Sequence, residues 1–168
     1  YTSHSMHQGS GYNTVRYSFD LWSQWLMYIM SGERVYVDDC QYVGYQCLYY
    51  TRPDEQIFRE GDYSTETIGR IPSANTYAYR IGFLASGFYQ DPYLKMELAR
   101  VSNGYSRFEY DFLWLTPVNF LIMNDPDLEP KSYQDLPNTK YFGEPNGLMM
   151  ARTGWNFGLD APDAIAMM

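Results

Sequence analysis

The stretch LPNTKYFGEPNGLMMARTGW, from Leu136 to Trp155, decides the fold of the C-terminal part of the chain. Residues 139–142 and 148–153 are short runs of mostly apolar and aromatic residues, and the sequence Gly-Glu-Pro-Asn-Gly between them is rich in turn-forming residues. This pattern predicts two strands joined by a turn. A third short strand is expected at 164–168, so the chain ends in an antiparallel sheet.

Upstream of residue 124 the sequence has the spacing of helices. Apolar residues recur every three or four positions from Val15 to Met30, which predicts a helix over 14–30 that ends at Gly32. Further helices are expected at 38–50, 73–87, 92–101 and 106–115, and the last either continues past Pro117 toward Met123 or breaks there. Asp-Pro and Glu-Pro pairs then predict an extended polar linker over 124–138.

Helices first and strands last predict a mainly α chain in which an α-helical domain leads into a β domain. Residues 1–123 are expected to form the helical domain, and residues 139–168 the start of the β domain. The spacing of the helices is compatible with a helical array or a toroid of antiparallel helix pairs.

The composition sets further limits. The chain has 168 residues, 45% of them hydrophobic, and a net charge of -8. The hydrophobic share excludes global disorder, no apolar run reaches the length of a membrane span, and the acidic balance argues against nucleic acid as a partner. The chain starts without an initiator Met and stops within an expected strand. We therefore expect an internal portion of a longer polypeptide.

The chain is rich in tyrosine. The 18 tyrosines fit either a core with polar edges or a carbohydrate cleft, in which sugar rings stack on phenol rings. Cys40 and Cys47 would lie about 10.5 Å apart along one helix, at 1.5 Å per residue. A disulfide needs Cα atoms within about 7 Å, so both are expected to be free thiols.

The loop at residues 3–12 contains the only two histidines, His4 and His7, with Gln8 and Tyr12, just before a predicted helix. A helix N-terminus favours an anion, and Arg16 lies one turn further on. The loop is therefore a candidate site for an acidic ligand, although a structural role for either imidazole stays open.

A second polar loop contains Tyr63 between acidic residues, where it is either a surface residue or a functional phenol. Paired carboxylates for glycoside hydrolysis have their candidates in Asp38, Asp39, Asp62 and Glu66. No metal site is expected in this chain, because none of these clusters offers a full set of ligands.

Residues 136–155 resemble the junction of the heparinase II/III-like polysaccharide lyases, which has the form LP..RYFG.P.GWM.ARTGW. The His-Gln-Gly loop before a helix, and a Gly-Asp-Tyr loop about fifty residues later, follow the same order as in that family. The resemblance implies part of an (α/α) toroid of antiparallel helix pairs. The first strands of an antiparallel β-sandwich would follow it.

The resemblance also implies an activity, the cleavage of uronic-acid-containing glycans by β-elimination. Tyr63 would be the base, and also the acid, while His7 would neutralise the uronate carboxylate. A phenol titrates near pH 10, so it needs a nearby cation or hydrogen-bond donors to act as a base. His4 is the alternative imidazole. The expected substrate-binding residues are His4, Gln8, Tyr12 and Arg16.

The family contributes a further histidine from the β-sandwich, beyond residue 168 of this chain. The rest of the same polypeptide would therefore complete the site. No cofactor is expected within this chain, whereas a divalent metal is an expected cofactor in the part of the β domain beyond it. The other implications are an acidic polysaccharide substrate, a homodimer, and a periplasmic or secreted location. The net charge of -8 suggests either a less sulfated uronate glycan or a positive cleft that residues absent from this chain complete.

Two alternatives stay open beside the lyase. One is a toroidal glycoside hydrolase that acts on uronides with a pair of carboxylates, and the other is a glycan-binding protein without catalysis. The lyase hypothesis requires His7 and Tyr63 to line one pocket. Tyr110 and Trp114 would offer stacking surfaces there, or would pack in the core.

Overall fold

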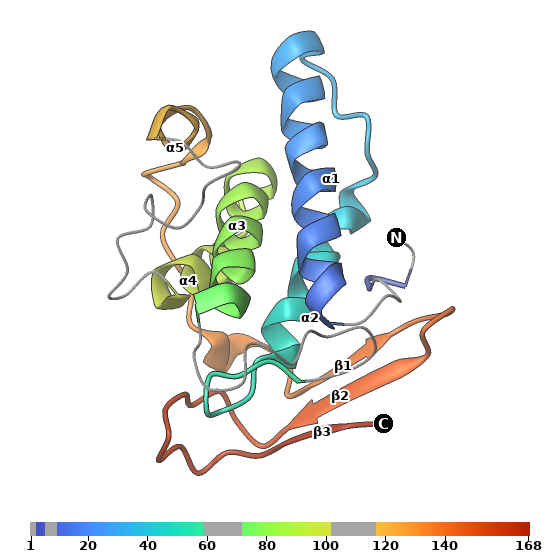
Figure 1. Ribbon diagram of the computed structural model, residues 1–168, viewed down its shortest axis with the longest axis vertical. Helices are drawn as coiled ribbons and strands as arrows, with labels where there is room; N and C mark the ends of the chain where they lie inside the picture. The colour runs from blue at the N-terminus through green and yellow to red at the C-terminus, as the bar shows by residue number, and fades with distance from the viewer. Residues whose placement is uncertain (1–2, 6–9, 59–71, 102–116) are drawn as a thin grey trace.

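A computed structural model describes residues 3–5, 10–58, 72–101 and 117–168. The chain is rich in helices and ends in a small antiparallel sheet (Figure 1). The α-helices are α1 (Ser10–Ser31), α2 (Val43–Tyr50), α3 (Pro72–Tyr89), α4 (Pro92–Val101) and α5 (Pro117–Met123). The described residues also form the short 3-10 helices η1 (Asp38–Tyr42) and η3 (Tyr133–Asp135) and the strands β1 (Thr139–Phe142), β2 (Leu148–Arg152) and β3 (Ile165–Met167).

Most of the expected elements are confirmed. The helices predicted at 14–30, 73–87 and 92–101 correspond to α1, α3 and α4, and all three predicted strands are present. Helix α1 begins earlier than predicted, at Ser10, so Tyr12 lies on the helix and not in the loop before it. The prediction of one α-helix over 38–50 is wrong in its first part, because residues 38–42 form the tighter 3-10 helix η1 before α2 begins. The helix expected at 106–115 lies outside the described residues, whereas residues 117–123 form the helix α5.

The ends of two helices follow from single residues. Gly32 has φ +74°, which suits glycine, and its N–H donates to the carbonyl of Tyr28 where α1 stops. At the start of α4, Asp91 accepts hydrogen bonds from the backbone N–H groups of Tyr93 and Leu94, at 2.9 and 3.0 Å. No helix in the described part of the chain is long and apolar enough to cross a membrane.

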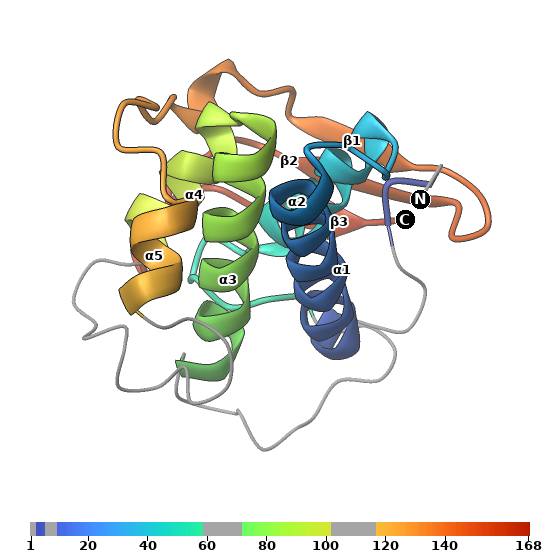
Figure 2. The ribbon, with the colours of Figure 1, turned by 90° about the horizontal axis from the view of Figure 1, so that it is seen from above.

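Helix α3 lies between α1 on one side and α4 with α5 on the other (Figure 2). Its glycines allow close approach: a Cβ on Gly82 would lie 3.1 Å from the carbonyl oxygen of Leu94 in α4. A Cβ on Gly87 would lie only 2.4 Å from the carbonyl oxygen of Met123 in α5. The helical layer thus depends on backbone contacts that a side chain would block.

The sheet has the order β1-β2-β3, and both pairs of strands are antiparallel. Lys140 is opposite Met150 in the first pair. Side chains alternate between two faces: Phe142 and Met150 are buried on the face toward the helices, whereas Tyr141 is 59% exposed on the other face. The sheet lies beneath the helices, next to α2 (Figure 1).

Aromatic rings join the sheet to the helices. Phe142 of β1 packs edge-on against Tyr49 and Tyr50 of α2, with ring centroids 6.4 and 6.2 Å apart. Trp155, just after β2, contacts Tyr49 at 5.0 Å and stacks on Tyr133 at 5.6 Å. Tyr133 belongs to the segment 124–138 that was expected to be extended, and its burial ties this part of the segment to the core.

A buried carboxylate supports the same junction from α4. Glu97 accepts two hydrogen bonds from the guanidinium of Arg100, at 2.7 and 2.9 Å, and a third from the hydroxyl of Tyr133 at 2.7 Å. Burial, with the charge of Glu97 beside it, raises the pKa of the Tyr133 phenol. The phenol is therefore a hydrogen-bond donor at neutral pH, and it links η3 to α4.

Both cysteines are free thiols, as predicted, and both are buried. Burial raises the pKa of Cys47 to about 12 and also raises that of Cys40. Both thiols therefore stay protonated and unreactive at neutral pH.

Phe142→Ala should destabilise the fold by about 3–5 kcal/mol, because it removes a fully buried ring and leaves a cavity against α2. Tyr141→Ala is the matched control, since the exposed face of the same strand should lose less than about 1 kcal/mol. Urea unfolding followed by circular dichroism measures both free energies of unfolding. Equal losses would contradict this assignment of the two faces.

Gly87→Ala should destabilise the protein by about 1–3 kcal/mol, because a backbone carbonyl blocks the new methyl group. Gly44→Ala in α2 is a second glycine-to-alanine change in a helix, but there the nearest atom is Cδ1 of the flexible Leu94 side chain, at 2.9 Å. Alanine favours the helix, so this variant should change the stability by less than about 1 kcal/mol. Thermal unfolding of the two variants compares them directly, and a larger loss for Gly44→Ala would refute the close approach of α5 to α3.

Candidate functional site

The predicted site residues divide into two groups. His7, Gln8 and Tyr63 lie outside the described residues, as do Tyr110 and Trp114, so their predicted proximity stays a prediction. Tyr12 and Arg16 are exposed near the start of α1, and His4 is half-buried in the loop before it. Of the predicted residues, His4 therefore has the most informative surroundings.

The loop of residues 3–5 lies against the turn that joins β1 to β2. The side-chain amide of Asn146 donates a 2.6 Å hydrogen bond to the hydroxyl of Ser5, across 141 residues of sequence. His4 has φ 56°, a left-handed conformation that is uncommon outside glycine. Its ring centroid lies 4.8 Å from that of Tyr42, the last residue of η1. The imidazole is thus held where the helical layer meets the sheet.

Lys140 of β1 completes this corner of the molecule. Its ammonium nitrogen lies 5.1 Å from the ring centroid of Tyr42, 6.0 Å from that of Tyr45 and 5.9 Å from that of Phe142. Aromatic faces attract a cation at such distances. We call His4, Tyr42, Tyr45 and Lys140 the His4–Lys140 corner.

Electrostatics in the His4–Lys140 corner favour a neutral imidazole beside a positive ammonium. Burial lowers the pKa of His4, and the charge of Lys140 lowers it further, against an opposite effect of Asp39. Burial also lowers the pKa of Lys140. A lysine normally titrates roughly three pH units above neutrality, so we take its ammonium group as charged at pH 7. The corner therefore offers one cation, one neutral imidazole and phenol rings, a set suited to a negatively charged ligand.

Sequence reasoning missed Tyr42 and Lys140. The available signal was the alternation of the predicted strand, which places residue 140 on the same face as the apolar Phe142. A lysine on the inward face of a strand is unusual, because lysine is rarely buried without a partner, and it could have been noted as a candidate functional residue. Tyr42 gave no such signal, because the 3-10 helix that presents it was predicted as part of an α-helix.

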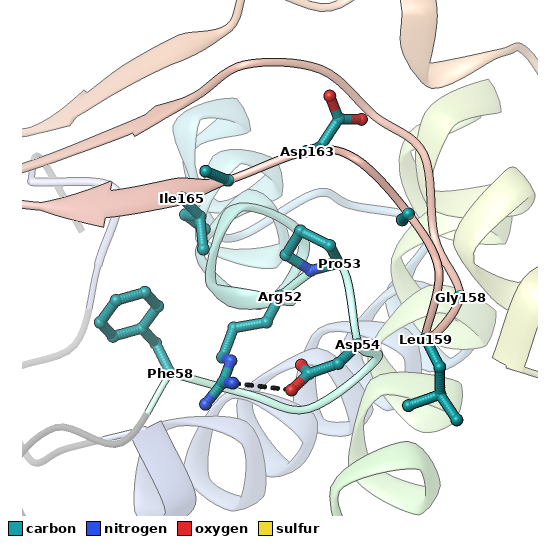
Figure 3. A pocket seen from close by; sticks show the side chains of 10 residues that line it. Arg52, Pro53, Asp54, Phe58, Gly158, Leu159, Asp163 and Ile165 are labelled. Carbon is teal, nitrogen blue, oxygen red and sulfur yellow. Dashed lines mark hydrogen bonds and ion pairs between the residues drawn. The ribbon is translucent and has the colours of Figure 1, made fainter.

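A separate pocket of about 400 Å³ lies between the turn after α2 and the segment before β3 (Figure 3). Arg52 and Asp54 form an ion pair of 2.6 Å at its wall, and the ring of Phe58 faces the same space. The pocket is lined by Arg52, Pro53, Asp54, Phe58, Gly158, Leu159, Ala161, Asp163, Ala164 and Ile165.

The two carboxylates of this pocket are already engaged. Asp163 accepts hydrogen bonds from Asn156 and Thr153, and Figure 3 shows its carboxylate directed away from Arg52. These bonds, with the backbone N–H of Asn156 first, lower the pKa of Asp163. Of the four carboxylates proposed for hydrolysis, Asp62 and Glu66 lie outside the described residues, and Asp39 is exposed. Asp38 is also exposed, and its Oδ1 lies 3.9 Å from a guanidinium nitrogen of Arg34.

In the ranges that the structure describes, no group of three or more His, Cys, Asp or Glu side chains is arranged to hold a metal ion. Among these residues, the His4–Lys140 corner has the chemistry closest to that expected from the sequence. A comparison of the sequence with protein-family models and with curated proteins found no match.

The imidazole of His4 should have a pKa below that of an ordinary histidine, because of its burial and the charge of Lys140. Lys140→Met should raise this pKa, and Asp39→Asn should lower it further. Two-dimensional NMR of the Hε1 signal measures the midpoint, and His4→Gln assigns it, since His7 is the only other histidine. An unchanged midpoint in Lys140→Met would show that the two side chains do not interact.

Proposed function

We propose that this chain is part of a polysaccharide lyase that cleaves uronic-acid-containing glycans by β-elimination. One observation supports this most. The lyase-like segment 136–155 contributes Lys140 to a corner that also contains His4, from the loop that sequence reasoning selected. Helices that lead into an antiparallel sheet are compatible with the proposed toroid and β-sandwich.

The chemistry explains why such residues are needed. A base removes the proton on C5 of the uronate, the C4–O bond breaks, and a C4–C5 double bond forms, while the leaving oxygen takes up a proton. The C5 proton is very weakly acidic until the adjacent carboxylate is neutralised. Donors and cations aimed at the developing enediolate supply this stabilisation.

The proposed roles follow the resemblance. Tyr63 is the base and also returns the proton to the leaving oxygen, and His7 with Gln8 neutralises the carboxylate. His4 is the alternative imidazole for that role. Its lowered pKa makes it a neutral hydrogen-bonding group at pH 7, so that any positive charge there comes from Lys140.

Substrate contacts are proposed for Tyr12 and Arg16, which are both exposed on the first turns of α1. The guanidinium of Arg16 suits a carboxylate or sulfate group. A histidine from the rest of the polypeptide, beyond residue 168, would complete the site. A divalent metal in that part, a homodimer and a periplasmic or secreted location belong to the same proposal.

The direct test is to incubate the full-length polypeptide with a panel of uronate polysaccharides and to follow ultraviolet absorbance. Elimination creates a double bond conjugated to the carboxylate, so absorbance should rise. Tyr63→Phe should slow this rise by at least about a hundredfold, the usual minimum contribution of a general base. Tyr141→Phe, on the exposed face of β1, is the control and should leave the rate unchanged.

Two other results would replace the proposal. New reducing ends without absorbance would indicate hydrolysis by a pair of carboxylates. Binding of the polysaccharides without either product would indicate a glycan-binding protein.

A further inference from the structure

Lys140 is the starting point, because within the described part of the chain its charge lacks the partner that a half-buried cation normally has. Among the described residues, no carboxylate forms an ion pair with it and no acceptor binds its ammonium group, whereas Arg52 and Arg100 have acidic partners. Arg152 also has no ion pair there, but its Nε donates a hydrogen bond to the carbonyl of Gly154. Removing a cation from water without an acidic partner costs free energy, which aromatic rings offset only in part. The N–H groups of this ammonium are therefore available to donate hydrogen bonds to an anion.

The position of Lys140 is enforced by the fold. Phe142, two residues further along β1, is fully buried against α2, and the alternation of the strand directs residue 140 to the same face. The long side chain therefore runs along apolar surface and brings its ammonium to the edge of the helical layer. Three ring centroids lie within 6.0 Å of the nitrogen.

The other side of the corner comes from the loop of residues 3–5. The bond between Ser5 and Asn146 holds this loop on the same hairpin that contains Lys140. His4 then shares the ring of Tyr42 with Lys140, at 4.8 and 5.1 Å respectively. Among the described residues, the charges that act on His4 are those of Lys140 and, on the side of η1, the exposed Asp39.

We propose that the His4–Lys140 corner binds one carboxylate of an acidic sugar, and that Lys140 selects acidic over neutral glycans. That the ligand is a sugar rests on the proposed function. The ammonium would pair with the carboxylate, the neutral imidazole would donate a hydrogen bond to it, and the ring of Tyr42 would contact the sugar face. A single point charge matches a carboxylate better than the several sulfates of a heparin-like chain.

The test compares two ligands on the intact chain, a tetramer of mannuronate and the same tetramer with its carboxylates reduced to alcohols. Wild type should bind the acidic tetramer about tenfold more tightly, which is the usual contribution of one charged hydrogen bond. Lys140→Met should abolish the preference and Lys140→Arg should retain it. Lys131→Met is the matched control, because it removes the same charge from an exposed ion pair elsewhere. Isothermal titration calorimetry measures all four proteins.

Several results would overturn the inference. One is a wild type that binds both tetramers equally, and another is a Lys140→Met variant that keeps the preference while its circular dichroism is native. A sulfated neutral oligosaccharide that binds more tightly than the mannuronate tetramer would show that sulfate, not carboxylate, is the ligand.

The proposed function and this inference fail in different ways. If the full-length polypeptide yields no unsaturated product but Lys140→Met still abolishes the preference for the acidic tetramer, the proposed lyase activity is wrong and the carboxylate site is confirmed. If elimination occurs and Lys140→Met leaves KM for the uronate polysaccharide unchanged, the proposed lyase activity is confirmed and the proposed carboxylate site is wrong.

Discussion

Three strands of three to five residues do not form a stable sheet in water unless one face is covered. Here the cover is α2, whose Tyr49 and Tyr50 pack against the fully buried ring of Phe142. Trp155 extends the same cluster by contacting Tyr49 and by stacking on Tyr133. This contact fixes which face of β1 turns inward, because a shift by one residue would exchange the two faces. All other features of the junction depend on that choice.

One consequence is that a lysine is placed on the inward face. Residues 140 and 142 of β1 share a face, so burying Phe142 also brings Lys140 against Tyr42 and Tyr45. A protein that needed only stability would be better served by an apolar residue at 140, since a half-buried ammonium without an acidic partner is costly. Its neighbour across the ring of Tyr42 is His4, which comes from a distant part of the sequence. The cost is understandable if the corner serves binding.

The sequence predicted the elements better than their contacts. Helices and strands were readable because apolar spacing and turn residues are local signals, and Gly32 and Asp91-Pro92 mark helix ends by local chemistry. The bond from Asn146 to Ser5 joins residues 141 positions apart, and no local pattern encodes such a contact. Lys140 left a signal in the alternation of the strand, whereas Tyr42 left none. The roles of His7 and Tyr63 stay predictions.

The acidic character of the chain and an acidic ligand are compatible on physical grounds. A net charge of -8 acts mainly through the long-range field, which salt screens beyond about 8–10 Å. Most of the described basic side chains are occupied, as in the pairs of Arg52 with Asp54 and Arg100 with Glu97. A bound carboxylate instead responds to charges in contact with it, and there the His4–Lys140 corner presents an ammonium that forms no ion pair with any described residue. The overall charge would thus slow the encounter with a polyanion, while the local charge would determine which sugar is held.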